Sequence, residues 1–329
     1  MLILDAAEVR QALPMRSAVE GMKRAFAALS EGRAVVPLRA HLPVEPHQGI
    51  SLVMSAFVQD AQGEALTVKV VSLFDGNAAL GLPRIQAAVL VLEPGTGRPV
   101  ALLEGAALTA IRTGAASGAA TDLLARSDCA TAAVFGAGVQ ARTQLEAVCT
   151  VRPIETVWIH DPVPGRAEEL AAELAGRDPI PPDVRAAADA RQAVADADVV
   201  CTATTSRVPV FAHADLKQGV HVNAVGSYQP DVREIPPETV IGSRVVVDSR
   251  EAALCEAGDL IQPIRRGLID QEHIHAELGE LVLGRRPGRG GPEEITLFKA
   301  VGVAVQDALA ARLALDCAEQ LGLGQRVRW

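Results

Sequence analysis

The feature of this sequence that most constrains its fold is a glycine-rich turn between an apolar strand and a helix. The stretch Thr131-Ala-Ala-Val-Phe-Gly-Ala-Gly-Val-Gln-Ala141 carries the form Gly-x-Gly-x-x-Ala. In this form Gly136 permits the tight turn, Gly138 lets a pyrophosphate approach the backbone, and Ala141 keeps the helix close to the sheet. The N-terminus of the helix offers free N–H groups to the anion. The pattern therefore predicts a dinucleotide site.

An acidic residue at the end of the next predicted strand supports this interpretation. Asp161 follows Trp158-Ile-His160, at the place where a carboxylate contacts the ribose hydroxyls of NAD and repels the additional phosphate of NADP. Arg166 lies close enough in the sequence to soften that preference, so the sequence indicates NAD(H) and leaves NADP(H) open. A chance glycine loop is the alternative, and it is disfavoured because strand, helix and acidic residue stand in the expected order.

The 329 residues and their hydrophobic pattern predict an α/β protein with two domains. We expect an α+β domain (residues 1–120 and 303–329) and a Rossmann-type dinucleotide-binding domain with a doubly wound parallel sheet (residues 121–302). In the first domain, a helix that Pro14 opens should lie on a mixed or antiparallel sheet. The last helix, Ala300 to Leu321, should return to this domain. The sheet is expected from Ile50 to Val58, Leu66 to Phe74, Ile85 to Leu92 and Pro99 to Leu103.

Composition excludes several classes of function. The net charge is -9, and no basic run offers a surface for nucleic acid. No apolar run reaches the roughly 20 residues that a membrane span needs, and the start of the chain lacks a signal-peptide pattern. Five scattered cysteines indicate reduced thiols in a cytoplasmic protein. His273-Ile-His275 is half of a metal site without a third ligand at useful spacing, so we expect no metal.

Two cationic residues interrupt apolar segments and are candidates for binding an anionic substrate. Lys69 lies in the apolar strand Thr67-Val-Lys-Val-Val-Ser-Leu73, so its ammonium lies either at a solvated edge or in a site, because an unpaired buried charge is costly. Arg112 interrupts a small-residue helix, where it makes either a salt link between domains or a bidentate contact with a carboxylate. Arg39 and Arg84-Ile-Gln86 are weaker instances, for which a surface position is the simpler alternative.

Several longer motifs are shared with one known family. The matching stretches are Lys69-Val-Val, Gly81-Leu-Pro, Thr109-Ala-Ile-Arg-Thr-Gly-Ala-Ala-Ser117, Val134-Phe-Gly-Ala-Gly-Val-Gln140, Asn223-Ala-Val-Gly-Ser-Tyr-Gln-Pro-Asp-Val-Arg-Glu234 and Ile295-Thr-Leu-Phe-Lys-Ala-Val-Gly302. On these motifs the chain resembles the ornithine cyclodeaminase and mu-crystallin family over nearly its whole length. The resemblance implies a homodimer, an N-terminal substrate and dimerisation domain completed by the C-terminal helix, and a nicotinamide cofactor bound by the second domain.

The resemblance also implies roles for single residues. Lys69 and Arg112 line the substrate site, Arg39 corresponds to a carboxylate-binding arginine, and Gln86 is similar to a residue of one branch of the family. The residues expected to bind the cofactor are Thr113, Gly136, Ala137, Gly138, Val139, Gln140, Asp161, Arg166, Thr202, Ala203, Thr204, Val225, Gly226, Ser227 and Lys299.

The stretch Gly226-Ser-Tyr-Gln-Pro-Asp231 separates the chemistries of the family. In the family that this chain resembles, the cyclodeaminases and alanine dehydrogenases carry a catalytic aspartate two residues after this glycine. This chain has Tyr228 at that position. An aspartate is an anion at neutral pH, whereas a tyrosine is a neutral donor. Asp231 lies only three residues further on and could swing in, so ornithine cyclodeaminase stays an alternative.

The form Ser-Tyr-Gln-Pro-Asp-x-Arg-Glu is more similar to the family's ketimine reductases, which reduce pyrroline-2-carboxylate and piperideine-2-carboxylate to proline and pipecolate. We therefore expect NAD(P)H-dependent reduction of such a cyclic imino acid, with Arg112 and Arg39 binding its carboxylate. Lys69, Tyr228 or Asp231 would keep the ring nitrogen protonated, because an iminium accepts hydride more readily than a neutral imine. An alanine or N-alkyl amino acid dehydrogenase and a non-catalytic ligand binder like mu-crystallin are further alternatives.

Overall fold

The computed structural model describes residues 1–328, and the chain divides into two compact units. Unit 1 comprises Met1–Arg112 together with the chain from Val303 onward, and unit 2 comprises Thr113–Gly302. The first boundary falls inside the helix α3 (Gly105–Leu124), whereas the sequence pattern placed it after residue 120. Small residues continue through this helix without a break, so the sequence carries no local signal of where one unit ends.

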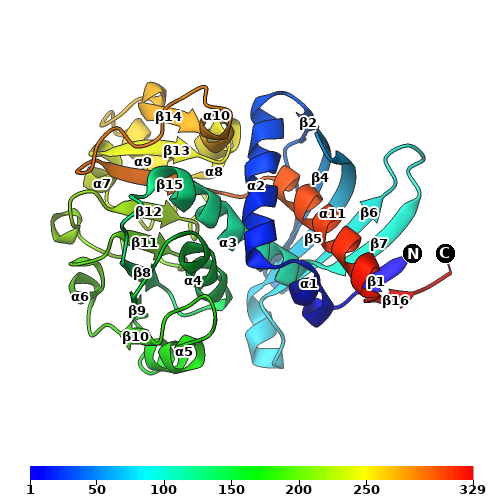
Figure 1. Cartoon of the computed structure of the whole chain (residues 1–329), viewed down its shortest axis with the longest axis horizontal. Helices are drawn as coiled ribbons and strands as arrows, with labels where there is room; N and C mark the ends of the chain where they lie inside the picture. Colours follow the sequence, from blue (N-terminus) through cyan, green and yellow to red (C-terminus); the bar gives the residue numbers. More distant parts are fainter. Residues whose placement is uncertain (329) are drawn as a thin grey trace. The chain divides into compact units, whose positions relative to one another are not determined.

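Unit 1 is built on a mixed sheet, as predicted. Its order is β16-β1-β7-β6-β5-β4-β2, with β3 paired to β4, and among these pairs β1 and β7 run parallel. The first and last strands, β1 and β16, lie side by side at one edge (Figure 1). The strands are β1 (Leu2–Leu4), β2 (Ala34–Val35), β3 (Ala40–Val44), β4 (Gly49–Asp60), β5 (Gly63–Phe74), β6 (Ile85–Leu92), β7 (Pro99–Glu104) and β16 (Gln325–Arg326).

Helices cover one face of this sheet, and their ends follow the local sequence. The helices are α1 (Ala6–Ala12), α2 (Met15–Ser30), the first part of α3, and α11 (Ala304–Leu321), with short 3-10 helices at Glu45–His47 and Asp75–Leu80. Asp5 and Glu8 form a reciprocal capping box at the start of α1. Pro14 directly precedes α2, as predicted. Figure 1 shows α2 and α11 packed together, and α11 contacts β4 and β5.

The two faces of the unit 1 sheet differ in burial. Along β4, Leu52 and Met54 are buried, whereas Val53 between them is 39% exposed. Along β5, Lys69 is 1% exposed and Val70 is 42% exposed. This alternation follows from the two-residue period of a strand. It places Lys69 on the buried face of the sheet, so the alternative of an exposed sheet lysine is wrong.

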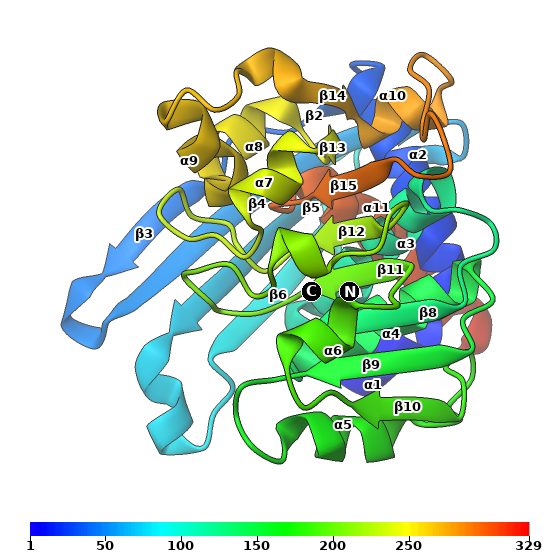
Figure 2. The same ribbon diagram turned by 90° about the vertical axis from the view of Figure 1, so that its left-hand side faces the viewer.

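Unit 2 contains a parallel sheet in the order β10-β9-β8-β11-β12-β15-β13-β14. Figure 2 shows these strands stacked from β10 at the bottom to β14 at the top. The order reverses between β8 and β11, which is the switch point where doubly wound sheets bind ligands. The strands are β8 (Thr131–Phe135), β9 (Thr156–His160), β10 (Asp183–Ala186), β11 (Val199–Thr202), β12 (His221–Ala224), β13 (Ser243–Val247), β14 (Ile274–Glu277) and β15 (Ile295–Lys299).

Helices between these strands complete the predicted doubly wound fold. Leu145 and Val148, on the helix that follows β8, pack into a core with Val134, Val157 and Val199 from the sheet. The helices are the rest of α3, α4 (Val139–Val151), α5 (Arg166–Leu174), α6 (Ala190–Val194), α7 (Pro237–Ile241), α8 (Arg250–Glu256), α9 (Gly258–Arg265) and α10 (Leu278–Val282), with 3-10 helices at His213–Asp215 and Gln271–His273. His221 and His213 make structural hydrogen bonds within this unit, to Thr296 and Thr239 respectively.

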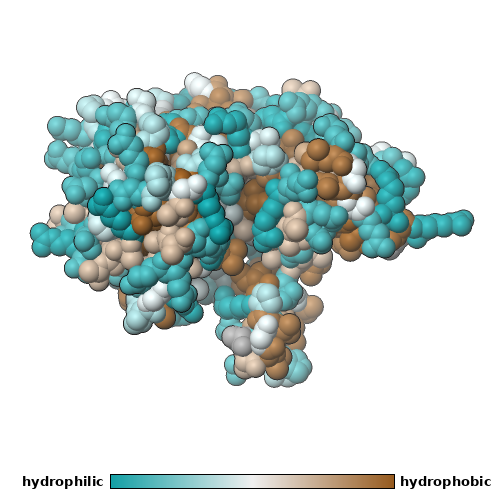
Figure 3. Space-filling view, turned by 60° about the horizontal axis from the view of Figure 1, so that its bottom comes forward, coloured by the Kyte–Doolittle hydropathy of each residue, from teal (hydrophilic) through white to brown (hydrophobic). Residues whose placement is uncertain are grey.

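Hydrophobic side chains remain exposed on unit 1. Figure 3 shows them at the surface of the segment that projects downward in that view, where β5 and β6 are joined. The exposed apolar residues of this unit include Val35, Leu38, Leu42, Val53, Val70, Leu80, Leu82 and Ile85. Within residues 1–328, the structure has no helix of the length and apolar character that a membrane span requires.

Candidate dinucleotide and substrate sites

A pocket of about 470 Å³ lies in unit 2 at the carboxyl ends of β8, β9 and β11. This position is the switch point between β8 and β11. The glycine turn forms one wall, the residues after β9 form a second, and the segment after β11 forms a third. The lining residues are Phe135–Gly138, His160–Val163, Arg166, Ala203–Ser206, Pro209 and Val210.

The two glycines of the turn are required for different reasons. Gly136 has a φ of 91°, in the region that favours glycine, and a Cβ on it would lie 2.7 Å from the carbonyl oxygen of Ala203. Gly138 has a φ of -88°, and a Cβ on it would meet nothing within 4 Å. The protein itself therefore needs glycine at 136 but not at 138. Open space beside Gly138 is what a pyrophosphate needs in order to reach the backbone.

The start of α4 also fits a dinucleotide. Gly138 is its N-cap and supplies no side-chain hydrogen bond, so the first N–H groups of the helix stay available to an anion. The side-chain Oε1 of Gln140 is buried and has no hydrogen-bond partner within residues 1–328. Gly138 and the start of α4 therefore fit the pyrophosphate of a nicotinamide dinucleotide, whereas the Gln140 oxygen, as an acceptor, has no role in binding that anion.

Asp161 lies at the pocket, where the sequence predicted it. One carboxylate oxygen accepts a hydrogen bond from the N–H of Ala137 at 2.8 Å, and the other accepts one from the N–H of Val163 at 2.9 Å. The carboxylate therefore ties the glycine turn to the loop after β9. Arg166 lines the same pocket as the first residue of α5 and is exposed.

Lys69 and Arg112 are brought together in unit 1 by a residue that the sequence analysis missed. The Lys69 Nζ lies 2.6 Å from one carboxylate oxygen of Asp307, and the Arg112 Nε lies 3.1 Å from the other. Arg112 also donates a hydrogen bond to the side-chain oxygen of Gln306 at 2.9 Å. All of these side chains are buried. One carboxylate thus pairs with two cations, and the cluster keeps a net positive charge.

Burial and pairing set the ionisation of this cluster. Burial lowers the pKa of Lys69 to about 8, although the Asp307 carboxylate partly offsets the effect. Burial alone would raise the pKa of Asp307, but Lys69 and Arg112 bring it below its ordinary value. Arg39 is near enough to contribute to the lowered pKa of Lys69. At neutral pH the cluster therefore holds an ionised carboxylate, an arginine and a mostly protonated lysine.

A signal for Asp307 was present in the sequence. It is an acidic residue in the first turn of α11, at helical spacing from the buried Ala304, Ala311 and Ala314, and it is 1% exposed. Buried carboxylates are rare unless they are paired. Its partners are far away in the chain, with Arg112 separated from it by 195 residues, so the pairing itself could not be seen.

The other predicted substrate-site residues lie at more open positions. Gln86 is exposed in β6, and its amide donates a hydrogen bond to the carbonyl of Pro83. Tyr228 is half-buried in the loop after β12. Asp231 is exposed and forms an ion pair with Arg207.

Several predicted cofactor residues lie beneath the pocket rather than on its lining. Thr202, Ser227 and Lys299 are buried, and protein groups satisfy their polar atoms. Thr113 is half-buried in α3, and Val225 donates a backbone hydrogen bond to the carbonyl of Thr202. The remaining predicted positions at the turn are Val139, which is 65% exposed, and Ala137, which lines the pocket.

The parallel sheet, its glycine turn and its switch-point pocket define a dinucleotide-binding α/β protein with a buried cationic cluster in its other unit. The profile of the ornithine cyclodeaminase/mu-crystallin family matches residues 1–321, and the chain belongs to this family.

Known proteins of this kind align over the whole chain. A Δ1-pyrroline-2-carboxylate reductase from Bacillus cereus is 39% identical over 330 residues, covering 100% of both chains. The solved structure of Thermococcus litoralis Δ1-pyrroline-2-carboxylate reductase, in complex with NADH and L-proline, matches with a TM-score of 0.94 and 46% identity, covering 99% of this chain and 100% of that one. An archaeal alanine dehydrogenase dimer with bound NAD matches with a TM-score of 0.92 and 31% identity, covering 100% and 99%.

Proposed function

We propose that this protein is an NAD(H)-dependent reductase of small cyclic ketimine carboxylates, which converts Δ1-pyrroline-2-carboxylate to L-proline and Δ1-piperideine-2-carboxylate to L-pipecolate. The observation that carries the proposal is the buried cluster of Lys69, Arg112 and Asp307 in a chain that also holds a dinucleotide pocket. The substrate has one carboxylate and one imine nitrogen. A cluster with a net positive charge and a protonated amine offers a partner to each.

Each residue of the cluster has a separate role in the proposed reaction. The Arg112 guanidinium binds the substrate carboxylate, with Arg39 as a second cation nearby. The Lys69 ammonium transfers a proton to the ring nitrogen of the neutral imine, and the Lys69 amine then accepts a hydrogen bond from the iminium N–H. Asp307 holds both cations in place through its two oxygens. The reduced nicotinamide, when bound, supplies the hydride to the imine carbon.

We assign the proton to Lys69 rather than to Tyr228 or Asp231. Lys69 is buried and has a pKa of about 8, which lies near neutral pH as a general acid requires. Asp231 is an exposed carboxylate paired with Arg207, and Tyr228 is half-buried. Gln86 is proposed to contact the substrate from β6.

The cofactor is proposed to lie along the pocket of unit 2. Gly136, Gly138 and the start of α4 would hold its pyrophosphate, and Asp161 would meet its adenosine ribose. The two solved structures described above carry NADH or NAD. The Asp161 carboxylate favours the unphosphorylated ribose of NAD(H). Arg166 at the rim of the pocket offers a cation to the additional phosphate of NADP(H), which should bind more weakly.

We also propose that unit 1 is the substrate-binding and dimerisation domain and that the protein is a homodimer. Val53 and Val70 are paired across β4 and β5 on the exposed face of the sheet, so the apolar surface is continuous there. Replacement Val70→Glu should dissociate the dimer in analytical ultracentrifugation. Leu268→Glu, which alters an exposed leucine of unit 2, is the matched control and should leave the dimer intact. A Val70→Glu variant that still sediments as a dimer would refute this surface.

Turnover assays test the function directly. Loss of NADH absorbance is measured with pyrroline-2-carboxylate and, separately, with piperideine-2-carboxylate. Ornithine with NAD is run beside them with an assay for ammonia. NADH consumption with an imine supports the reductase. Ammonia from ornithine without net loss of NADH would instead establish a cyclodeaminase, and binding without turnover would establish a ligand binder.

The five free cysteines support a cytoplasmic location.

A further inference from the structure

The wall of the dinucleotide pocket that follows β11 is held by a residue outside the pocket, Glu234. Its side chain is fully buried. One carboxylate oxygen accepts hydrogen bonds from the backbone N–H and the hydroxyl of Thr204, both at 2.7 Å. The backbone carbonyl of Glu234 accepts a third bond from the N–H of Val210 at 2.9 Å. Thr204 and Val210 both line the pocket, near the two ends of this wall.

The second carboxylate oxygen of Glu234 holds the neighbouring loop after β12. It accepts hydrogen bonds from the backbone N–H of Ser227 at 3.0 Å and from the hydroxyl of Thr202 at 3.2 Å. A Cβ on Gly226 would lie 2.4 Å from this oxygen, so only glycine fits above the carboxylate. The same loop continues into Tyr228. Glu234 therefore joins the pocket wall to the loop that carries Tyr228.

A second buried carboxylate fixes Glu234 itself. Asp259 accepts hydrogen bonds from the backbone N–H groups of Glu234 at 2.7 Å and Ile235 at 3.0 Å. The Lys299 Nζ lies 2.9 Å from Asp259 and donates to the Ser227 carbonyl at 2.6 Å. Lys299 is the last residue of β15. The loops at the ends of three adjacent parallel strands, β11, β12 and β15, are thus tied together under the pocket.

We propose that Glu234 is a positioning residue for the dinucleotide, acting through Thr204 and Val210, and that it couples cofactor binding to the loop of Tyr228. A chain of contacts leads from Glu234 to the glycine turn, because Thr204 and the preceding carbonyl of Ala203 lie directly against Gly136. A change at Glu234 therefore alters the width of the pocket beside the turn. This proposal rests on NAD(H) binding and is independent of which imine or amino acid is the substrate.

The replacement Glu234→Gln tests this role because an amide cannot replace the carboxylate. Each oxygen of Glu234 accepts one backbone N–H, from Thr204 on one side and from Ser227 on the other. An amide offers one oxygen and one NH2 group, so in either orientation an NH2 group faces a backbone N–H. One of the two hydrogen bonds, to the N–H of Thr204 or to that of Ser227, must therefore break.

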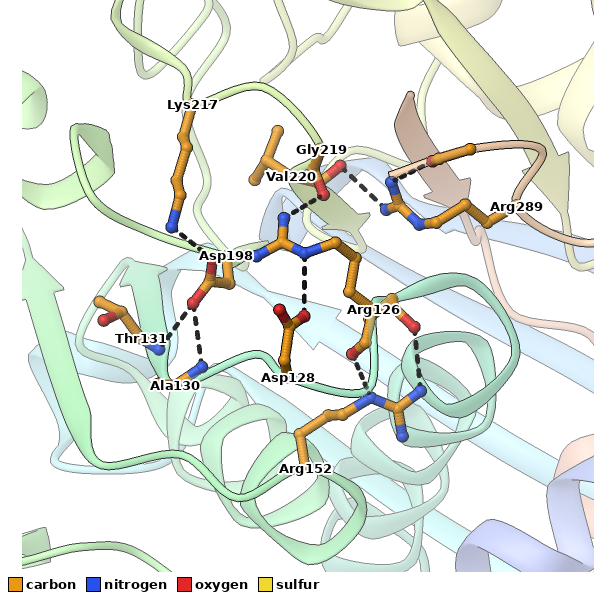
Figure 4. A network of polar contacts seen from close by, with 12 residues as sticks. Arg126, Asp128, Ala130, Thr131, Arg152, Asp198, Lys217, Gly219, Val220 and Arg289 are labelled. Atoms are coloured by element: carbon orange, nitrogen blue, oxygen red, sulfur yellow. Dashed lines mark hydrogen bonds and ion pairs between the residues drawn. The ribbon is translucent and has the colours of Figure 1, made fainter. Parts of the chain in front are cut away.

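The chain offers a matched control at the amino end of β11, the strand whose carboxyl end leads into the pocket wall. Asp198 precedes β11, is buried, and also accepts four hydrogen bonds (Figure 4). Its donors are Arg126, Lys217 and the N–H groups of Ala130 and Thr131, none of which lines the pocket. Asp198→Asn should lower stability as Glu234→Gln does, without moving the pocket wall.

The experiment measures the Kd of NADH by calorimetry in the absence of substrate, at a temperature where circular dichroism shows every variant folded. Hydrogen exchange of the Thr204 and Val210 amides is followed in parallel. Glu234→Gln should weaken NADH binding at least tenfold and speed exchange at both amides. Asp198→Asn should lower the Tm but keep the Kd within twofold and leave the exchange unchanged.

Two results would overturn the proposal. The first is a Glu234→Gln variant that binds NADH within twofold of the parent protein. The second is an equal loss of NADH affinity in both variants, which would reflect general destabilisation. If Glu234→Gln does not fold, Glu234→Asp is measured against the same limits, because it keeps the charge but shortens the bridge by one methylene. Binding is measured without an imine, so failure of the reductase proposal leaves this test intact.

Discussion

Replacing Asp307 should change the pH dependence of catalysis in a direction that the structure fixes. Lys69 has a lowered pKa of about 8, so the parent protein should lose kcat/KM as the pH rises through about 8 and Lys69 gives up its proton. The Asp307 carboxylate lies 2.6 Å from the ammonium and favours its charged form. In Asp307→Asn this support is lost while the size of the side chain is kept, and the pKa of Lys69 falls further.

The size of the shift follows from the distance. Two unit charges 2.6 Å apart interact by about 1.6 kcal/mol in water and about 6 kcal/mol at an effective dielectric constant of about 20. One pKa unit corresponds to about 1.4 kcal/mol. The pKa of Lys69 should therefore fall by at least about one unit, to about 7 or below. With a pKa of about 7, the protonated fraction at about pH 8.5 drops roughly eightfold and at about pH 6 changes little, and a larger fall in the pKa moves the whole alkaline limb further towards acid pH.

The assay is the pH profile of kcat/KM for NADH-dependent imine reduction, with each profile normalised to its own acidic plateau. Normalisation removes a uniform loss caused by a displaced Arg112, and the titration of the imine is common to all variants. Asp60→Asn is the control. Asp60 pairs with Arg312 on the same helix α11, so its replacement should lower stability without contacting Lys69. An Asp307→Asn profile whose alkaline limb stays at the parent pH would refute the assignment of the proton to Lys69.

Three further predictions concern the glycine turn, a buried histidine and the loop after β12. Gly136→Ala should destabilise the fold by about 1–3 kcal/mol in urea unfolding, because it combines a positive φ with a contact to Ala203, whereas Gly138→Ala should keep the stability and weaken NADH binding. Equal stability losses in the two variants would contradict this. Burial lowers the pKa of His221 to about 3, below its unfolded value, so stability should be lost by up to about 1.4 kcal/mol per pH unit as the pH falls from about 6.5 towards 3, and His221→Gln should flatten that slope. Tyr228→Phe should keep kcat within about threefold if Lys69 is the acid, and a loss above about tenfold would move that role to the tyrosine.

The sequence by itself determined the features that depend on neighbouring residues. Turn chemistry identified Gly136 and Gly138, and the two-residue period of a strand put Lys69 on one face with Thr67 and Val71. The start of α11 was predicted at Ala300, but the helix begins at Ala304, after a non-helical segment whose N–H groups at Val301 and Gly302 donate to Asp248. The short strands β3 and β14 were not predicted, because edge strands carry little periodic signal in a few residues.

Only the tertiary structure decided which charged residues share a site. Lys69, Arg112 and Asp307 come from a strand and two helices that are distant in the sequence, and each alone is compatible with an exposed position. Glu234 was visible as the end of a motif, but its bridge to Thr204 depends on how three strand ends are aligned. Burial is the physical reason in both cases. A charge removed from water must find partners, and the long-range folding of the chain determines which partners are in reach.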